Sequence, residues 1–164
     1  MRRVMTLISI AILTIADQLL KLLVIAKLKP SSSLSFINGV LQWNYVENTG
    51  AAFGSFSSHT MILSILTLVI IIAILIYLMK PDRKVSVEYI SLVMIISGGL
   101  GNLIDRFYRG FVVDYIDPLF IKFAVFNFAD MLVTCGAFLL IFWLIKGIIS
   151  DYIKKGKSDE QTDN

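Results

Sequence analysis

Four aspartates of this 164-residue chain lie within or beside long apolar stretches: Asp17, Asp105, Asp114 and Asp130. A charged side chain inside a membrane costs about 2.5–3.5 kcal/mol even on lenient scales, so it faces a bundle interior or water and tends to mark function. If the apolar stretches cross a membrane, Asp17 falls about 20 Å along the first one at ~1.5 Å per residue. The other three fall at the same outer depth. Their convergence predicts a functional site.

The residue types present limit the catalytic mechanisms that such a site could use. The chain has one histidine, His59, and one cysteine, Cys135, which excludes a disulfide framework and makes a nucleophile–histidine pair implausible. Cys135 is expected to pack as a small apolar side chain. Two carboxylates held a few ångströms apart share one proton and can hydrolyse an amide without a metal or cofactor. Asp114 and Asp130 flank one external segment and form the natural pair, although spacing alone leaves Asp17 or Asp105 as substitutes.

Other polar residues share helical faces with these aspartates. Asp17 and Lys21 are four residues apart, which allows an ion pair. Asn102, Asp105 and Arg106 form one polar stripe, preceded by glycines that allow close helix approach. Simpler readings exist: Asp105 and Arg106 as an interfacial cap and a snorkelling base, and Asp130 as a helix N-cap.

The composition predicts the elements that hold these residues. The chain is 57% hydrophobic and 16% charged, with a mean hydropathy of +0.79. We expect an all-α membrane protein, a four-transmembrane-helix bundle in one domain over residues 1–157, followed by a polar tail, 158–164. Its basic residues are scattered along the chain, which argues against nucleic acid as a partner. The expected spans are about 4–25, 61–79, 87–105 and 128–149.

The two external connections differ in pattern. Residues 34–57 are expected to form a small extracytoplasmic β-sheet, because Leu41, Trp43 and Tyr45 alternate with polar residues after an Asn38-Gly39 turn. Trp43 and Tyr45 would anchor it at the interface. The second connection is expected to be a short amphipathic segment. Most of the fifteen Lys and Arg fall on one side of this topology, which predicts that both termini are cytoplasmic.

Five blocks, together and in this order, resemble the bacterial lipoprotein signal peptidase (signal peptidase II) family along essentially the whole membrane portion. They are Asp17-Gln18-x-x-Lys21, Asn48-Thr49-Gly50-Ala51-Ala52-Phe53, Gly98-Gly99-x-Gly101-Asn102-x-x-Asp105-Arg106, Gly110-Phe111-Val112-Val113-Asp114-Tyr115-Ile116 and Phe126-Asn127-Phe128-Ala129-Asp130. The resemblance implies that Asp114 and Asp130 are the catalytic aspartates. It implies a substrate-binding set of Asp17, Lys21, Asn48, Gly50, Asn102, Asp105, Arg106 and Asn127.

By the same resemblance, the protein would be an intramembrane aspartic endopeptidase of the bacterial cytoplasmic membrane. It would cut diacylglyceryl-modified prolipoproteins before the lipidated cysteine, near the outer leaflet among membrane lipid, and globomycin-type inhibitors would block it. Two alternatives from other classes remain at this point. One is a small proton- or ion-coupled transporter using the aspartates as a relay. The other is a metal-dependent lipid-modifying transferase, which a chelator would inactivate.

Overall fold

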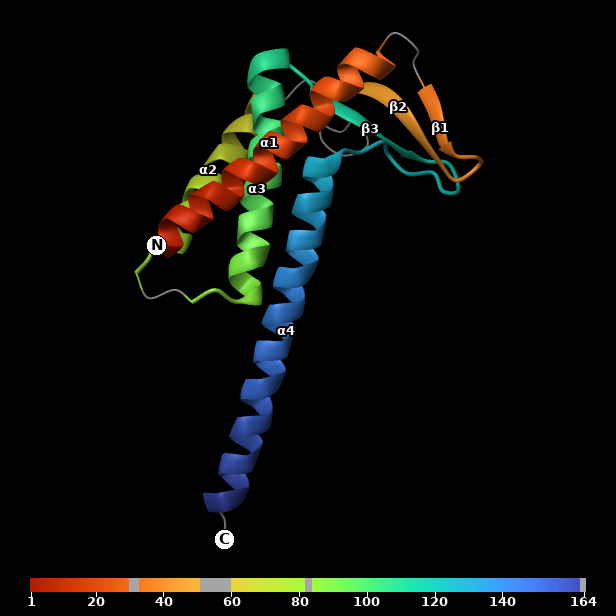
Figure 1. Ribbon diagram of the computed structural model, residues 1–164. Coiled ribbons are helices and arrows are strands. Elements are labelled where there is room, and N and C mark those ends of the chain that lie inside the picture. The colour runs from red at the N-terminus through yellow and green to blue at the C-terminus, as the bar shows by residue number, and fades with distance from the viewer. Residues whose placement is uncertain (30–32, 51–59, 82–83, 163–164) are drawn as a thin grey trace.

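The computed structural model describes residues 1–29, 33–50, 60–81 and 84–162. Within these ranges the chain forms helices and strands in the order α1, β1, β2, α2, α3, β3 and α4 (Figure 1). Their bounds are α1 Arg2–Leu28, β1 Ser33–Ile37, β2 Leu41–Asn48, α2 Thr60–Leu78, α3 Val87–Arg109, β3 Val112–Pro118 and α4 Phe128–Thr162.

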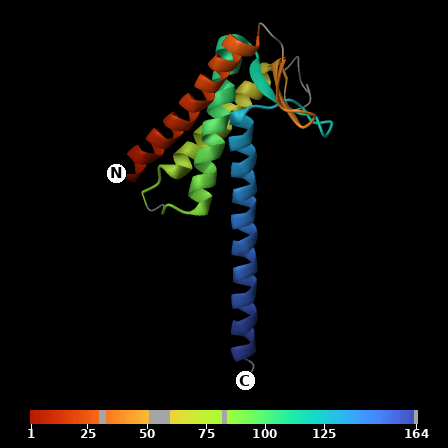
Figure 2. The ribbon, with the colours of Figure 1, turned by 45° about the vertical axis from the view of Figure 1, so that its right-hand side comes forward.

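The helices form a bundle around α3, which packs against α1, α2 and α4 (Figures 1 and 2). Each of the four is long and apolar enough to cross a membrane. Large apolar side chains cover the outside of the bundle, for example Leu19, Ile65 and Phe142. In α1 several polar side chains are turned inward instead, with Thr14, Asp17 and Lys21 buried. A surface of this kind is stable in lipid, and the expected fold class is confirmed.

Local sequence signals set where α3 begins and ends. Ser86 caps its first turn by accepting a hydrogen bond from the Tyr89 backbone N–H at 3.3 Å. Gly110 ends it with a positive φ of 79°, which favours a residue without a β-carbon. The helix therefore extends four residues beyond the expected end at position 105, and one continuous helix carries Asn102, Asp105 and Arg106.

The sheet has three antiparallel strands in the order β1-β2-β3. The first two form the expected hairpin, with Gly39 at φ 73° in its turn. The third strand corrects the sequence expectation, because β3 arises from the second connection, predicted only to be amphipathic. Its Val112-Val113 pair suits a buried strand, and both side chains are buried. This strand carries Asp114 and pairs it with Val46.

Two residues expected to anchor the sheet in the interface have partners within the protein. Trp43 stacks with Phe36 and Tyr115 at ring-centroid distances of 5.5 and 5.7 Å. Tyr45 donates a hydrogen bond to Glu47 at 2.8 Å. Both also pack against a buried cluster that includes Val24 and Leu28, and so join the sheet to α1.

The N-terminus lies beside the connection between α2 and α3, and the sheet lies at the opposite end (Figures 1 and 2). Arg2 donates a hydrogen bond to the Lys80 carbonyl there. The backbone of α4 continues through Thr162, so most of the expected polar tail is helical. Lysine, glutamate and glutamine are good helix formers, and they extend a helix that has already been nucleated.

Candidate active site

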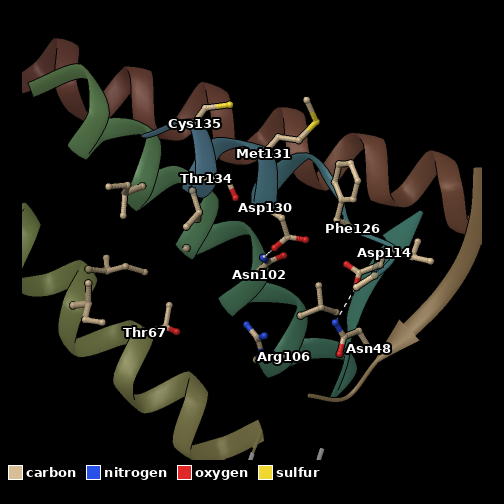
Figure 3. A pocket seen from close by; sticks show the side chains of 18 of the residues that line it. Asn48, Thr67, Asn102, Arg106, Asp114, Phe126, Asp130, Met131, Thr134 and Cys135 are labelled. Carbon is tan, nitrogen blue, oxygen red and sulfur yellow. Dashed lines mark hydrogen bonds between the residues drawn. The ribbon is translucent and has the colours of Figure 1, made fainter. Parts of the chain in front are cut away.

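A cavity of about 720 Å³ lies among α2, α3, α4 and β3 (Figure 3). Apolar residues line most of it, including Ile71 of α2 and Val133 of α4. Its polar lining gathers where the bundle meets the sheet, and Figure 3 shows these side chains facing a shared space. The polar group comprises Asn48, Asn102, Arg106, Asp114 and Asp130.

Asp114 is only 2% exposed. Its two oxygens accept hydrogen bonds from Asn48 Nδ2 at 2.8 Å and from Asn127 Nδ2 at 2.6 Å. Burial raises the pKa of Asp114 to about 7, and the nearby charge of Asp130 raises it as well, although the two amide donors act in the opposite direction. Asp114 thus binds a proton more tightly than an ordinary aspartate does.

Asp130 lies in the first turn of α4, within a reciprocal cap. Asn127 is the N-cap residue: its Oδ1 accepts from the Asp130 backbone N–H at 2.9 Å. In return, Asp130 Oδ2 accepts from the Asn127 backbone N–H at 3.1 Å. The other oxygen, Oδ1, accepts from Asn102 Nδ2 at 2.7 Å. Asp130 therefore stabilises the start of the helix and also lines the cavity. The N-cap position suggested for Asp130 is occupied by Asn127.

A second group of charges lies behind the cavity. Lys21 Nζ is 2.9 Å from Asp17 Oδ2 and 3.1 Å from Asp105 Oδ2, and all three side chains are 0% exposed. Asp17 Oδ1 also accepts from the Ala129 backbone N–H at 3.0 Å, and Asp105 Oδ2 accepts from that of Val113 at 3.0 Å. None of the three charged residues lines the cavity. These residues join α1, α3, α4 and β3 behind the cavity, and their expected role in substrate binding stays a prediction.

The remaining expected site residues lie nearer the cavity. Arg106 lines it and donates from Nη2 to the Gly50 carbonyl at 3.3 Å. Gly50 N–H in turn donates to Asn48 Oδ1 at 2.9 Å, which orients the amide that reaches Asp114. Asn127 is fully buried, and its amide nitrogen donates hydrogen bonds to Asn102 and Asp114. The rest of the second sequence block, residues 51–53, lies outside the described residues.

Two further residues of the charge cluster were not among the predicted site residues. Gln18 Nε2 donates to the Gly101 carbonyl at 3.0 Å and to Asp105 Oδ1 at 3.2 Å. Arg109 pairs with Asp105 one turn along α3 and donates to Gln18 Oε1 at 3.2 Å. The four-residue spacing of Asp105 and Arg109 was an available signal. Cys135 also departs from expectation, because it is exposed on the cavity wall.

Comparisons with known proteins agree along most of the chain. The family model described as signal peptidase (SPase) II matches residues 9–146. A lipoprotein signal peptidase of Streptococcus thermophilus is 41% identical over 146 residues, covering 89% of this chain and 95% of the relative. One from Halothermothrix orenii is 44% identical over 140 residues, covering 85% and 94%. A solved bacterial membrane enzyme superposes with a TM-score of 0.78 at 32% identity, covering 87% of this chain and 88% of the other. The transporter alternative is not favoured.

Proposed function

The chain belongs to the signal peptidase II family, and from this premise we propose that Asp114 and Asp130 are the catalytic pair of an aspartic endopeptidase. Membership makes the chain a multi-pass bacterial membrane enzyme that removes signal peptides from prolipoproteins. The observation that supports the aspartic mechanism is the convergence of two carboxylates, from β3 and α4, on one cavity.

The two carboxylates divide the chemistry. Asp114, whose pKa is raised to about 7, holds the shared proton and donates it towards the scissile carbonyl oxygen. Asp130 is the general base. It takes a proton from a water molecule as the water oxygen bonds to the carbonyl carbon. When the tetrahedral intermediate collapses, the carbon–nitrogen bond breaks and Asp130 returns a proton to the leaving nitrogen, while Asp114 regains its proton from a hydroxyl group as the new carboxyl group forms.

Polar groups at the rim of this pair would hold the substrate backbone. Arg106 Nε is buried and lacks a hydrogen-bond partner among the described residues. Because a buried unpaired donor is costly, a substrate carbonyl is a suitable acceptor for it. Asn48 already donates one amide N–H to Asp114, and Asn102 donates one to Asp130. Substrate binding would therefore depend on Arg106 and on Gly50, while the asparagines keep the two carboxylates aligned.

The shape of the cavity supports a lipid-modified substrate. Its polar end meets the sheet, and its apolar walls continue between α2, α3 and α4. We place the scissile bond on the N-terminal side of a diacylglyceryl-modified cysteine, with apolar parts of the substrate against Ile71 and Val133. This requires the sheet on the outer side and both termini in the cytoplasm. The basic residues at the start of α1, just after α2 and towards the C-terminal end of α4 agree with that orientation. Globomycin-type inhibitors would compete for the same cavity.

The test is cleavage of a diacylglyceryl-modified preprotein by Asp114→Asn and Asp130→Asn variants. Each should abolish cleavage, because neither asparagine can exchange the proton. Asp117→Asn is the matched control: this carboxylate also lies on β3 and accepts from Gln42 and Asn44 at 2.7 and 3.0 Å, away from the cavity. It should retain activity.

Binding can be followed separately at the single cysteine. Cys135 is exposed on the cavity wall, so bound substrate should shield it from a thiol reagent in wild type and in both inactive variants. Full cleavage by either Asn variant would remove that aspartate from the mechanism. Equal cleavage of a preprotein without the diacylglyceryl group would contradict the proposed substrate.

A further inference from the structure

Resting on the proposed function, we infer that Lys21 is a positioning residue for the Asp114 and Asp130 pair. It acts through Asn102, the amide side chain that lies between the buried charge cluster and the cavity. Lys21 then contributes to the rate of the reaction, in addition to the ion pairs by which it holds the helices together.

All donors of Lys21 are used inside the protein. An ammonium group has three N–H donors and no acceptor. Nζ lies 2.9 Å from Asp17 Oδ2, 3.1 Å from Asp105 Oδ2 and 2.9 Å from Asn102 Oδ1. The side chain is 0% exposed and does not line the cavity. Lys21 is thus saturated and screened from any substrate, so its influence on the reaction must pass through a neighbour.

The third contact determines which way the Asn102 amide points. Since an ammonium can only donate, the atom of Asn102 facing it is the oxygen. The amide nitrogen is thereby turned towards Asp130, and donates to Oδ1 at 2.7 Å (Figure 3). Without Lys21, the amide could rotate and present its oxygen to that carboxylate, and Asp130 would lose a donor.

The same orientation reaches Asp114 through Asn127. Asn102 Oδ1 also accepts from Asn127 Nδ2 at 3.1 Å, and that nitrogen donates to Asp114 Oδ1 at 2.6 Å. Asn127 Oδ1 is meanwhile held by the Asp130 backbone N–H. Lys21 therefore orients Asn102 directly and shares the Asn102 oxygen with Asn127, whose own direction is set at the start of α4, and the two amides together hold both carboxylates.

The cleavage assay compares a double variant, which removes Lys21 together with the charge of Asp17, with a matched control. Lys21→Met removes the donor but leaves Asp17 and Asp105 without their shared cation, which endangers folding. Lys21→Met combined with Asp17→Asn avoids this: Arg109 still pairs with Asp105, and the new amide oxygen can still accept from the Ala129 N–H. Lys146→Met, at an exposed lysine of α4, is the matched control.

We expect kcat of the double variant to fall about a hundredfold, the size of loss that a 1 Å displacement of reacting groups produces. KM and the substrate protection of Cys135 should stay within about threefold of wild type, because no substrate contact is removed. Lys146→Met should match wild type. Wild-type kcat in the double variant would overturn the inference, and so would a loss that appears in KM alone.

Failure to fold would also count against it. A double variant that does not fold would assign Lys21 to the fold and not to the pair. The proposed function is judged separately: cleavage by Asp114→Asn would refute the aspartic mechanism whatever Lys21 does.

Discussion

Replacement of Asn127 by aspartate is the sharpest test of how the site is held. The side chain is fully buried and does two things at once. Its oxygen accepts from the Asp130 backbone N–H at 2.9 Å and caps α4. Its nitrogen donates to Asp114 Oδ1 at 2.6 Å and to Asn102 Oδ1 at 3.1 Å. Asn127→Asp keeps an oxygen for the cap but removes both donors, so it separates the helix start from the alignment of the carboxylates.

The expected loss follows from the bond that disappears. A hydrogen bond to a charged group is worth about 1.5–3 kcal/mol. If that stabilisation is expressed in the transition state, kcat falls about 10- to 150-fold at 1.36 kcal/mol per decade. The new carboxylate adds repulsion towards the negative charge that the pair carries, which places the expectation at the upper end of this range. The cap remains, so the melting temperature should change little.

The assay is a time course of preprotein cleavage at several substrate concentrations, with a thermal melt of the same samples. Asn44→Asp is the matched control, because its amide also donates to a carboxylate, Asp117 Oδ2 at 3.0 Å, but lies on the sheet away from the cavity. Its kcat should equal that of wild type. The reasoning is refuted if Asn127→Asp keeps kcat within about threefold of wild type, or if Asn44→Asp loses as much.

Two further outcomes are expected from the packing and the electrostatics. Gly98→Ala should destabilise the protein by about 1–3 kcal/mol, as overpacking does, because its Cβ would lie 2.3 Å from the Ala129 carbonyl oxygen, which is backbone and cannot move aside. Gly147→Ala, which meets nothing within 4 Å, should be neutral in the same thermal melts, and equal losses in both would contradict this packing argument. Because burial raises the pKa of Asp114 to about 7, its carboxyl group keeps its proton at acidic pH and loses it as the pH rises through 7. The infrared band of a protonated carboxyl should follow that titration and vanish in Asp114→Asn; a midpoint near the ordinary value of about 4 would show that Asp114 is not buried as described.

Periodicity and composition by themselves determined much of this protein. The four spans, the hairpin and the depth shared by the four aspartates follow from apolar run length and from the cost of charge in lipid. The pairing of Asp17 with Lys21 followed from helical spacing. These features are local, so a single stretch of sequence carries them.

The division of the polar residues was decided only by the tertiary structure. Asp17 and Asp105 have the same side chain as Asp114 and Asp130 and lie at a similar depth, yet they are buried against Lys21 while the other pair lines a cavity. Which carboxylate meets the cation depends on how α1 crosses α3 and where β3 joins the sheet. Those contacts join residues far apart in the chain, and helix or strand period does not encode them.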